Sequence, residues 1–360
     1  MFNNILKRNE LLYKKGEKMY KLQTVVWEIT LSCNISCLHC GSNADIHKRP
    51  QELSTGEAFN LIEQLADLGC QRVILSGGEP FMRKDWSALA SRILTLGMEC
   101  NFISNGFAVN DETISLLKEV GIKYLGFSLD GATAKTHDYI RGKNGVFDHL
   151  MEVFDKLKKE KIMIAVVSTI HKGNISELDD IKKCLLEHQV DVWQIQTANI
   201  RGRMPKEWAV SDIDFYNVAK FIAENKCRYE GIMKITEGDC IGYYSKLTPY
   251  MGMQKWTGCN GGISALGIRS DGKITGCLSM QDDIYIEGSI REKSLREIWT
   301  DSNAFKYNRR FEISDLGGIC AECKYGPICR GGCSERSMTY SGKLHSQPYC
   351  LYDMEKRNKV

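Results

Sequence analysis

Six short apolar segments alternate with helical segments between residues 22 and 198, and this alternation is the feature that most constrains the fold. Short runs rich in β-branched residues are typical of buried parallel strands. The alternation therefore predicts an α/β protein with a partial (β/α)6 barrel of the TIM type. Strands are expected at 22–30, 72–76, 99–104, 123–129, 163–170 and 190–197, and helices at 54–68, 86–96, 111–120, 147–160 and 175–188.

Composition excludes several classes of protein. Hydrophobic residues make up 43% of the chain and charged residues 26%, as in a soluble globular protein. No apolar run has the length of a membrane span, and the N-terminus lacks a signal-peptide core, so we expect a cytoplasmic protein without membrane association. The net charge of +3 is too weak to predict nucleic-acid binding, although residues 1–21 form a basic N-terminal segment.

Three closely spaced cysteines follow the first predicted strand. Cys33, Cys37 and Cys40 have the spacing C-x3-C-x2-C, in a chain with 15 cysteines. In a cytoplasmic protein such an excess indicates metal or redox chemistry rather than disulfides. Three thiolates can hold a [4Fe–4S] cluster and leave one iron open for a small molecule. The alternative from the residues alone is a zinc site with His39 as the fourth ligand.

A second motif gives the triplet a family resemblance. Gly77-Gly78-Glu79-Pro80 ends the second predicted strand, one βα unit after the cysteines. The two motifs together resemble those of the radical SAM superfamily, where the residue before the third cysteine is usually aromatic and is His39 here. The resemblance implies that the cluster binds S-adenosylmethionine (SAM) and cleaves it reductively to a 5′-deoxyadenosyl radical. Gly77 and Gly78 would let the backbone approach the methionine part of SAM, and Glu79 would accept from its ammonium group.

Further residues of the SAM pocket are expected at the ends of later strands. The same resemblance implies roles for Ser104, Ser128 and Asp130, although each could equally be a cap or turn residue. Arg141 could pair with the SAM carboxylate or form an ordinary surface ion pair.

The C-terminal third carries a second set of cysteines, after a predicted hairpin with an Asp271-Gly272 turn. From about residue 256 to 352 it resembles the SPASM domain of radical SAM peptide-modifying enzymes, here a small cysteine-rich α+β unit. The resemblance implies two auxiliary [4Fe–4S] clusters, hence three in all. One would be held by Cys320, Cys323, Cys329 and Cys350. The other would be held by Cys259, Cys277 and Cys333, with Cys240 as fourth ligand or the position left open. The expected division is 1–21, 22–198 (barrel), 199–255 (helical bridge) and 256–360 (SPASM domain and tail).

The resemblance implies an enzyme that oxidises a ribosomally made peptide, giving a thioether, C–C or C–O crosslink. Expected partners are the peptide or protein substrate, a reductant such as flavodoxin or ferredoxin, and a separate leader-peptide-binding protein, because only about 21 residues precede the first strand. A formylglycine-forming sulfatase maturase is an alternative, but Leu278 stands where those enzymes have aspartate after the cysteine. A tetrapyrrole or quinone-cofactor maturase is another alternative. A non-catalytic iron–sulfur carrier or zinc scaffold would not need the Gly77–Pro80 motif.

Overall fold

The computed structural model describes residues 12–14, 17–47, 49–238, 241–251 and 256–357. Its main sheet has the strand order β12-β11-β10-β3-β4-β5-β6-β7-β8-β9, and β1 and β2 form a separate hairpin. The strands are β1 Leu12–Lys14, β2 Glu17–Met19, β3 Thr24–Thr30, β4 Arg72–Gly77, β5 Glu99–Ser104, β6 Tyr124–Ser128, β7 Met163–Ile170, β8 Val192–Thr197, β9 Lys234–Glu237, β10 Ala265–Ile268, β11 Lys273–Thr275 and β12 Gly288–Ser289.

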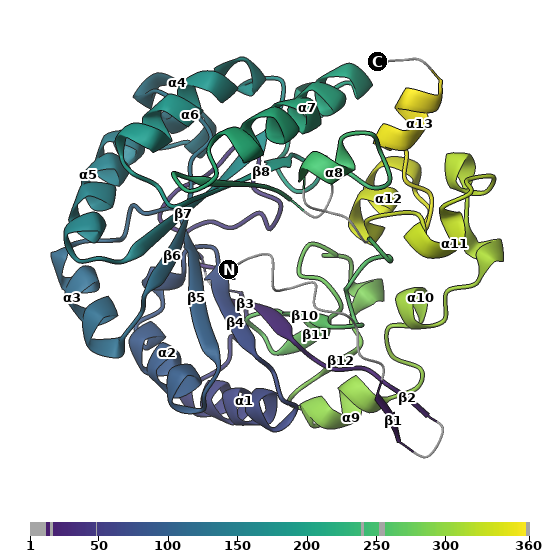
Figure 1. Ribbon diagram of the computed structural model, residues 1–360. Helices are drawn as coiled ribbons and strands as arrows, with labels where there is room; N and C mark the ends of the chain where they lie inside the picture. The colour runs from purple at the N-terminus through teal and green to yellow at the C-terminus, as the bar shows by residue number, and fades with distance from the viewer. Residues whose placement is uncertain (1–11, 15–16, 48, 239–240, 252–255, 358–360) are drawn as a thin grey trace.

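The larger helices surround the outer face of the curved sheet, and the C-terminal third lies on the remaining side (Figure 1). Since β9 and β12 are the two ends of the strand order, the barrel is not closed. The helices are α1 Thr55–Asp67, α2 Trp86–Thr95, α3 Asp111–Val120, α4 Ala134–Arg141, α5 Val146–Lys159, α6 Leu178–Glu187, α7 Asp212–Arg228, α8 Thr248–Met251, α9 Leu295–Thr300, α10 Lys306–Arg309, α11 Gly326–Cys329, α12 Ser334–Ser341 and α13 Leu351–Lys356. None of the helices in the described ranges is long and apolar enough to cross a bilayer.

The predicted α/β partial barrel is confirmed: β3 to β8 lie within a residue or two of the six expected strands. Ser54 caps α1 in a capping box with Glu57, as its sequence indicates. The predicted hairpin also forms, with β10 and β11 antiparallel on either side of Asp271-Gly272. The structure adds α4, and it adds β9 inside the segment expected to be a helical bridge.

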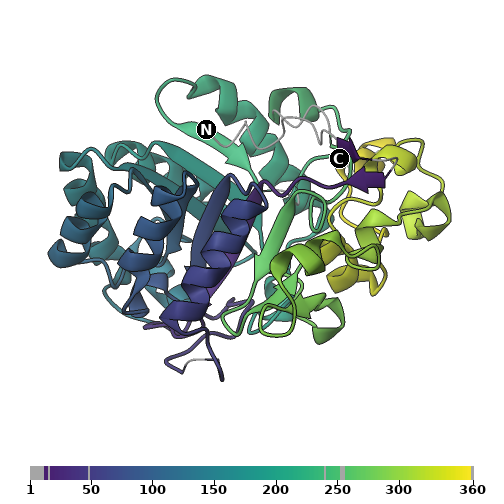
Figure 2. The ribbon, with the colours of Figure 1, turned by 90° about the horizontal axis from the view of Figure 1, so that it is seen from below.

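Strand β10 extends the sheet in a way that the sequence does not predict. It pairs in parallel with β3, so that Ala265 lies opposite Thr24 and Ile268 opposite Trp27. Val25 and Trp27 of β3 are fully buried in the core that the outer helices cover. Figure 2 shows the two parts of the molecule side by side, joined along this strand. Because β3 and β10 run in the same direction, the loops that follow them meet at one edge of the sheet.

Candidate functional site

The three N-terminal cysteines lie on the loop that follows β3. Cys33 and Cys37 are buried and Cys40 is partly exposed. Burial is the main cause that raises the pKa of Cys33 to about 12; a backbone hydrogen bond from Ile35 opposes the shift, and the Glu79 carboxylate and the other two thiols add to it. Buried thiols that repel one another in this way ionise readily only beside a compensating cation, which cluster iron supplies. The donor set therefore fits a thiolate-bound iron–sulfur cluster.

Two polar side chains donate towards these thiols. Asn105 Nδ2 lies 3.6 Å from Cys33 Sγ and Arg141 Nη1 lies 3.7 Å from Cys37 Sγ. Donors to sulfur stabilise the thiolate form that a metal requires. Asn105 is not among the residues predicted from the sequence. Its position directly after Ser104, at the end of a predicted strand, is the sequence feature that could have identified it as a site residue.

The two glycines of the Gly77-Gly78 pair allow β4 to approach the start of the cysteine loop. A Cβ on Gly77 would lie 2.1 Å from the Thr30 carbonyl oxygen, and one on Gly78 would lie 2.3 Å from the Leu31 oxygen. Gly78 N donates to the Thr30 carbonyl over 2.8 Å. These glycines therefore set the position of the cysteine loop, and their approach to SAM stays a prediction.

Replacing Gly78 by Ala should destabilise the protein by about 1–3 kcal/mol. The new Cβ would clash with the Leu31 carbonyl oxygen, and backbone atoms cannot move aside as a flexible side chain can. The measurement is the midpoint of urea unfolding under anaerobic conditions. Gly56→Ala is the matched control, since nothing lies within 4 Å of a Cβ at Gly56 in α1. That variant should be neutral or stabilised by up to about 1 kcal/mol. Equal midpoints for the two variants would contradict this packing role.

Glu79 is a fully buried carboxylate that organises the end of β5. It accepts hydrogen bonds from Ser104 Oγ and from the Asn105 backbone N–H, each over 2.8 Å. Burial raises the pKa of Glu79 to about 7 although these hydrogen bonds oppose the shift. The Ser104 hydroxyl is itself buried and also accepts from Gly106 N–H. Glu79 and Ser104 thus fix the backbone that presents Asn105, and direct contact of either with SAM stays a prediction.

Asp130 is the centre of a second buried polar cluster, after β6. Its Oδ2 lies 3.0 Å from His39 Nε2 and 2.5 Å from Arg141 Nη2, and its Oδ1 accepts from Thr169 N–H. Burial opposes ionisation, but Arg141 and His39 outweigh it and hold the pKa of Asp130 well below its usual range. Ser128 is partly exposed at the end of the same strand. The predicted residues His39, Asp130 and Arg141 therefore come together beside Cys37, and their contact with SAM stays a prediction.

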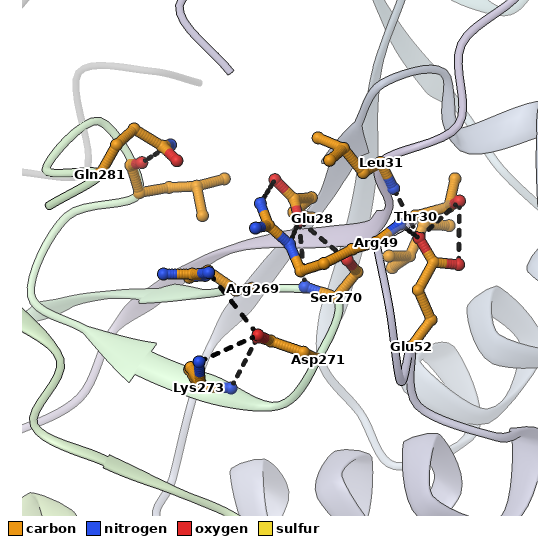
Figure 3. Close-up of polar contacts among 12 residues, drawn as sticks. Glu28, Thr30, Leu31, Arg49, Glu52, Arg269, Ser270, Asp271, Lys273 and Gln281 are labelled. Carbon is orange, nitrogen blue, oxygen red and sulfur yellow. Dashed lines mark hydrogen bonds and ion pairs between the residues drawn. The ribbon is translucent and has the colours of Figure 1, made fainter. Parts of the chain in front are cut away.

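A further network links the cysteine loop to β10 (Figure 3). Arg49 forms a two-pronged ion pair with Glu28, a fully buried carboxylate of β3, at 3.0 and 3.2 Å. Ser270, just after β10, donates its hydroxyl to the same carboxylate over 2.9 Å. Glu52 accepts from Leu31 N–H and from Thr30 Oγ1. The network is not predicted from the sequence, because a glutamate inside an apolar strand gives no indication of its partner.

Four C-terminal cysteines surround a cavity of about 410 Å³ at the edge of the molecule. These are Cys320, Cys323, Cys329 and Cys350, the set predicted to hold one auxiliary cluster. Burial, and then the thiol of Cys350, raises the pKa of Cys329 to about 12. Four mutually repelling thiols around one cavity fit the ligand set of a [4Fe–4S] cluster.

The remaining predicted ligands, Cys259, Cys277 and Cys333, are each partly exposed, and the thiols of Cys259 and Cys277 lie near each other. Burial, and then the thiol of Cys259, raises the pKa of Cys277 to about 11, with a smaller contribution from Glu335. Glu335 is two residues after Cys333. The phenol of Tyr307 is buried near Cys259 and Cys277, and its pKa is raised well above the ordinary value by burial and by these thiols. Cys240 lies outside the described residues, so the fourth ligand stays a prediction.

Two family models match parts of the chain that carry cysteines from both regions. The family model "Radical SAM superfamily" matches residues 27–185, and the model of the SPASM "iron-sulfur cluster-binding domain" matches residues 259–324. The chain belongs to the radical SAM superfamily. It is a radical SAM enzyme with a SPASM domain, and membership of this family implies SAM and iron–sulfur clusters as cofactors.

Curated relatives of this radical SAM enzyme have several different names. The chain is 29% identical to the AdoMet-dependent heme synthase of Methanosarcina barkeri, over 91% of this chain and 96% of the relative. It is 26% identical to the PqqA peptide cyclase of Rhizobium meliloti, over 90% and 85% respectively. Mycofactocin maturase MftC of Mycolicibacterium smegmatis is 25% identical over 86% of this chain and 77% of the relative. Similarity in sequence therefore extends across enzymes that act on different substrates.

Solved structures agree with the fold of this radical SAM enzyme. Streptococcus suis SuiB bound to S-adenosylmethionine has a TM-score of 0.74 at 16% identity, covering 88% of this chain and 74% of SuiB. The structure of anSMEcpe with bound AdoMet has a TM-score of 0.70 at 15% identity, covering 94% and 95% respectively. At such identities the likeness concerns the fold alone.

Proposed function

We propose that this radical SAM enzyme oxidises a C–H bond of a ribosomally made peptide and forms a thioether, C–C or C–O crosslink. The observation that carries the proposal is the distribution of nine cysteines over three places: three on the loop after β3, Cys259 beside Cys277, and four around the outer cavity. A SAM-binding site needs only the first set. The two further sets can hold auxiliary clusters, which would accept the electron that the substrate loses when it is oxidised.

When bound, the first cluster and SAM supply one electron and a 5′-deoxyadenosyl radical, which takes a hydrogen atom from a substrate carbon. The chain's own residues hold the cofactors and exclude water. Cys33 and Cys37 are buried, and Asn105 and Arg141 donate towards their sulfur atoms. The substrate loses a second electron and a proton as the new bond forms. Cys277 belongs to the set that we propose as ligands of the electron acceptor.

The inner wall of the barrel supports a peptide as substrate. Side chains near the carboxyl ends of β4, β6, β7 and β8 are polar, uncharged and partly exposed: Ser76, Ser128, Thr169 and Gln196. Strand β5, between β4 and β6, carries the apolar Ile103 at this level. Gln196 Nε2 donates to Thr169 Oγ1 over 3.1 Å and keeps its carbonyl group for another donor. Hydroxyls and amides that both donate and accept suit peptide groups. The propionate carboxylates of a tetrapyrrole would be matched better by cations than by these uncharged groups.

A second candidate is a tetrapyrrole maturase, because several relatives are named as such. Besides the heme synthase they include an Fe-coproporphyrin III synthase, 29% identical over 93% of this chain and 89% of the relative. Both candidates use the same radical chemistry. They differ in the molecule from which the hydrogen atom is taken.

Hydrogen transfer into 5′-deoxyadenosine separates the two candidates. The anaerobically reconstituted enzyme would be reduced with SAM and given either a deuterated peptide, chosen from any small reading frame found beside its gene, or Fe-coproporphyrin III deuterated on its propionates. We expect deuterium in 5′-deoxyadenosine from the peptide, and a peptide product that has lost two hydrogens. Transfer from the porphyrin alone would overturn the peptide proposal and support the second candidate.

The outer cavity gives a further prediction. Replacing Cys323 by Ala should spare reductive SAM cleavage, because the first cysteine set is left intact. It should stop formation of the oxidised product, because Cys323 belongs to a set proposed to hold a cluster that takes the electron from the substrate. The measurement is the amount of 5′-deoxyadenosine and of product from the same reaction, with iron content as the check on folding and loading. Continued product formation by a variant that has lost this cluster would show that the electron takes another route.

A further inference from the structure

The loop after β8 reaches across the sheet edge and binds the cysteine loop through one residue. Arg203 donates to three of its carbonyl oxygens: its backbone N–H to Cys40 over 3.0 Å, Nε to Cys37 over 2.9 Å and Nη1 to Ala44 over 2.9 Å. The contacts span the segment that carries the second and third cysteines. Arg203 therefore fixes the conformation of this loop from outside it.

The preceding residue makes this approach possible. Gly202 has a φ of +57°, and a Cβ there would lie 2.2 Å from the Cys40 carbonyl oxygen. Only glycine combines this backbone conformation with such close contact. Gly202 and Arg203 together are thus built for contact with the cysteine loop.

The charge of Arg203 has no carboxylate partner within 4.0 Å in the part of the chain that the structure describes, and its Nη2 is buried without a hydrogen-bond acceptor there. The neighbouring arginines differ. Arg141 lies 2.5 Å from the Asp130 carboxylate, and Arg201 lies 2.8 Å from that of Glu335. The positive charge of Arg203 is therefore not neutralised locally and acts on the cysteine loop itself.

We propose that Arg203 is a positioning residue that raises the reduction potential of the SAM-binding cluster. Reduction adds a negative charge to a cluster that three thiolates already make negative, and a fixed cation nearby favours that state. Arg203 acts through the Cys37 carbonyl that it binds, without touching SAM or substrate. The proposal rests on the proposed assignment of this cluster, but not on the identity of the substrate.

The test is a potentiometric EPR measurement on the full, cluster-loaded enzyme. The SAM-binding cluster is recognised as the signal that changes when SAM is added. At a fixed potential, Arg203→Gln should lower the ratio of reduced to oxidised cluster about tenfold, equivalent to about 59 mV for one electron. Arg203→Lys keeps the charge and should stay within about twofold of the unmodified enzyme. Arg92→Gln is the control, because Arg92 forms a surface ion pair with Glu63.

An unchanged ratio in Arg203→Gln would overturn the proposal, as would equal losses in the Gln and Lys variants, which would indicate geometry rather than charge. If Arg203→Gln does not load its cluster, Arg203→Lys becomes the deciding variant. It must load the cluster and keep the original ratio of reduced to oxidised cluster, and a shift in that ratio would refute the proposal. Absence of any SAM-responsive signal in the unmodified enzyme would instead refute the cluster assignment, so the two failures are distinguishable.

Discussion

Replacing Cys33 by Ala is expected to abolish reductive SAM cleavage and to remove one of three clusters. The loaded enzyme should then hold about 8 irons per chain instead of about 12. Cys33 is 7% exposed, its thiol accepts from Asn105 Nδ2 and it lies near the other two cysteines of the loop, so its loss should leave this set with two thiolates. The measurements are iron content after anaerobic reconstitution and 5′-deoxyadenosine formed on reduction with SAM.

The matched control is Cys227→Ala. Cys227 is exposed at the end of α7 and belongs to none of the three cysteine sets. This variant should keep both iron content and SAM cleavage. If Cys33→Ala retained cleavage, the assignment of the SAM site to this loop would be wrong. If it lost iron equivalent to more than one cluster, the loop would be needed for the whole fold rather than for one site.

The second large effect is expected from Arg49→Leu, which would leave the Glu28 carboxylate buried without a cation. Removing one partner of a buried ion pair costs about 3–5 kcal/mol. We expect the low end of this range, because the Arg49 side chain is 16% exposed while Glu28 is fully buried. The measurement is urea unfolding of the full chain, followed by far-UV circular dichroism under anaerobic conditions.

A double variant makes this prediction specific. Arg49→Leu together with Glu28→Gln removes both charges, and its stability should return to within about 1 kcal/mol of the original, since the main penalty is the unpaired charge. The Ser270 hydroxyl can still donate to the amide oxygen introduced at position 28, because it donates to the carboxylate there in the original chain. A double variant as unstable as Arg49→Leu would mean that packing, rather than the ion pair, determines the effect.

The division of the C-terminal cysteines into two ligand sets came from the resemblance to the SPASM domain and stays a prediction, whereas local patterns were enough to predict the alternating strands and helices and the Asp271-Gly272 hairpin. Each of these elements depends on residues that are close in the sequence. The pairing of β10 with β3 could not be predicted, because it joins residues about 240 positions apart through backbone hydrogen bonds that carry no side-chain signal. Glu28 and Arg203 were missed for the same reason: their partners are distant carbonyls and side chains.

The parallel pairing of β3 with β10 has a consequence for protein engineering. The backbone edge of β3 that faces β10 is covered only by the strand that also leads, through β11, to Cys277. A chain shortened before residue 256 would lose β10, β11 and β12, so that β3 would become the bare edge of a seven-stranded sheet from β3 to β9 and the chain would be prone to self-association. Exchange of the C-terminal part between homologous enzymes should therefore succeed only when β10 is transplanted together with a compatible β3.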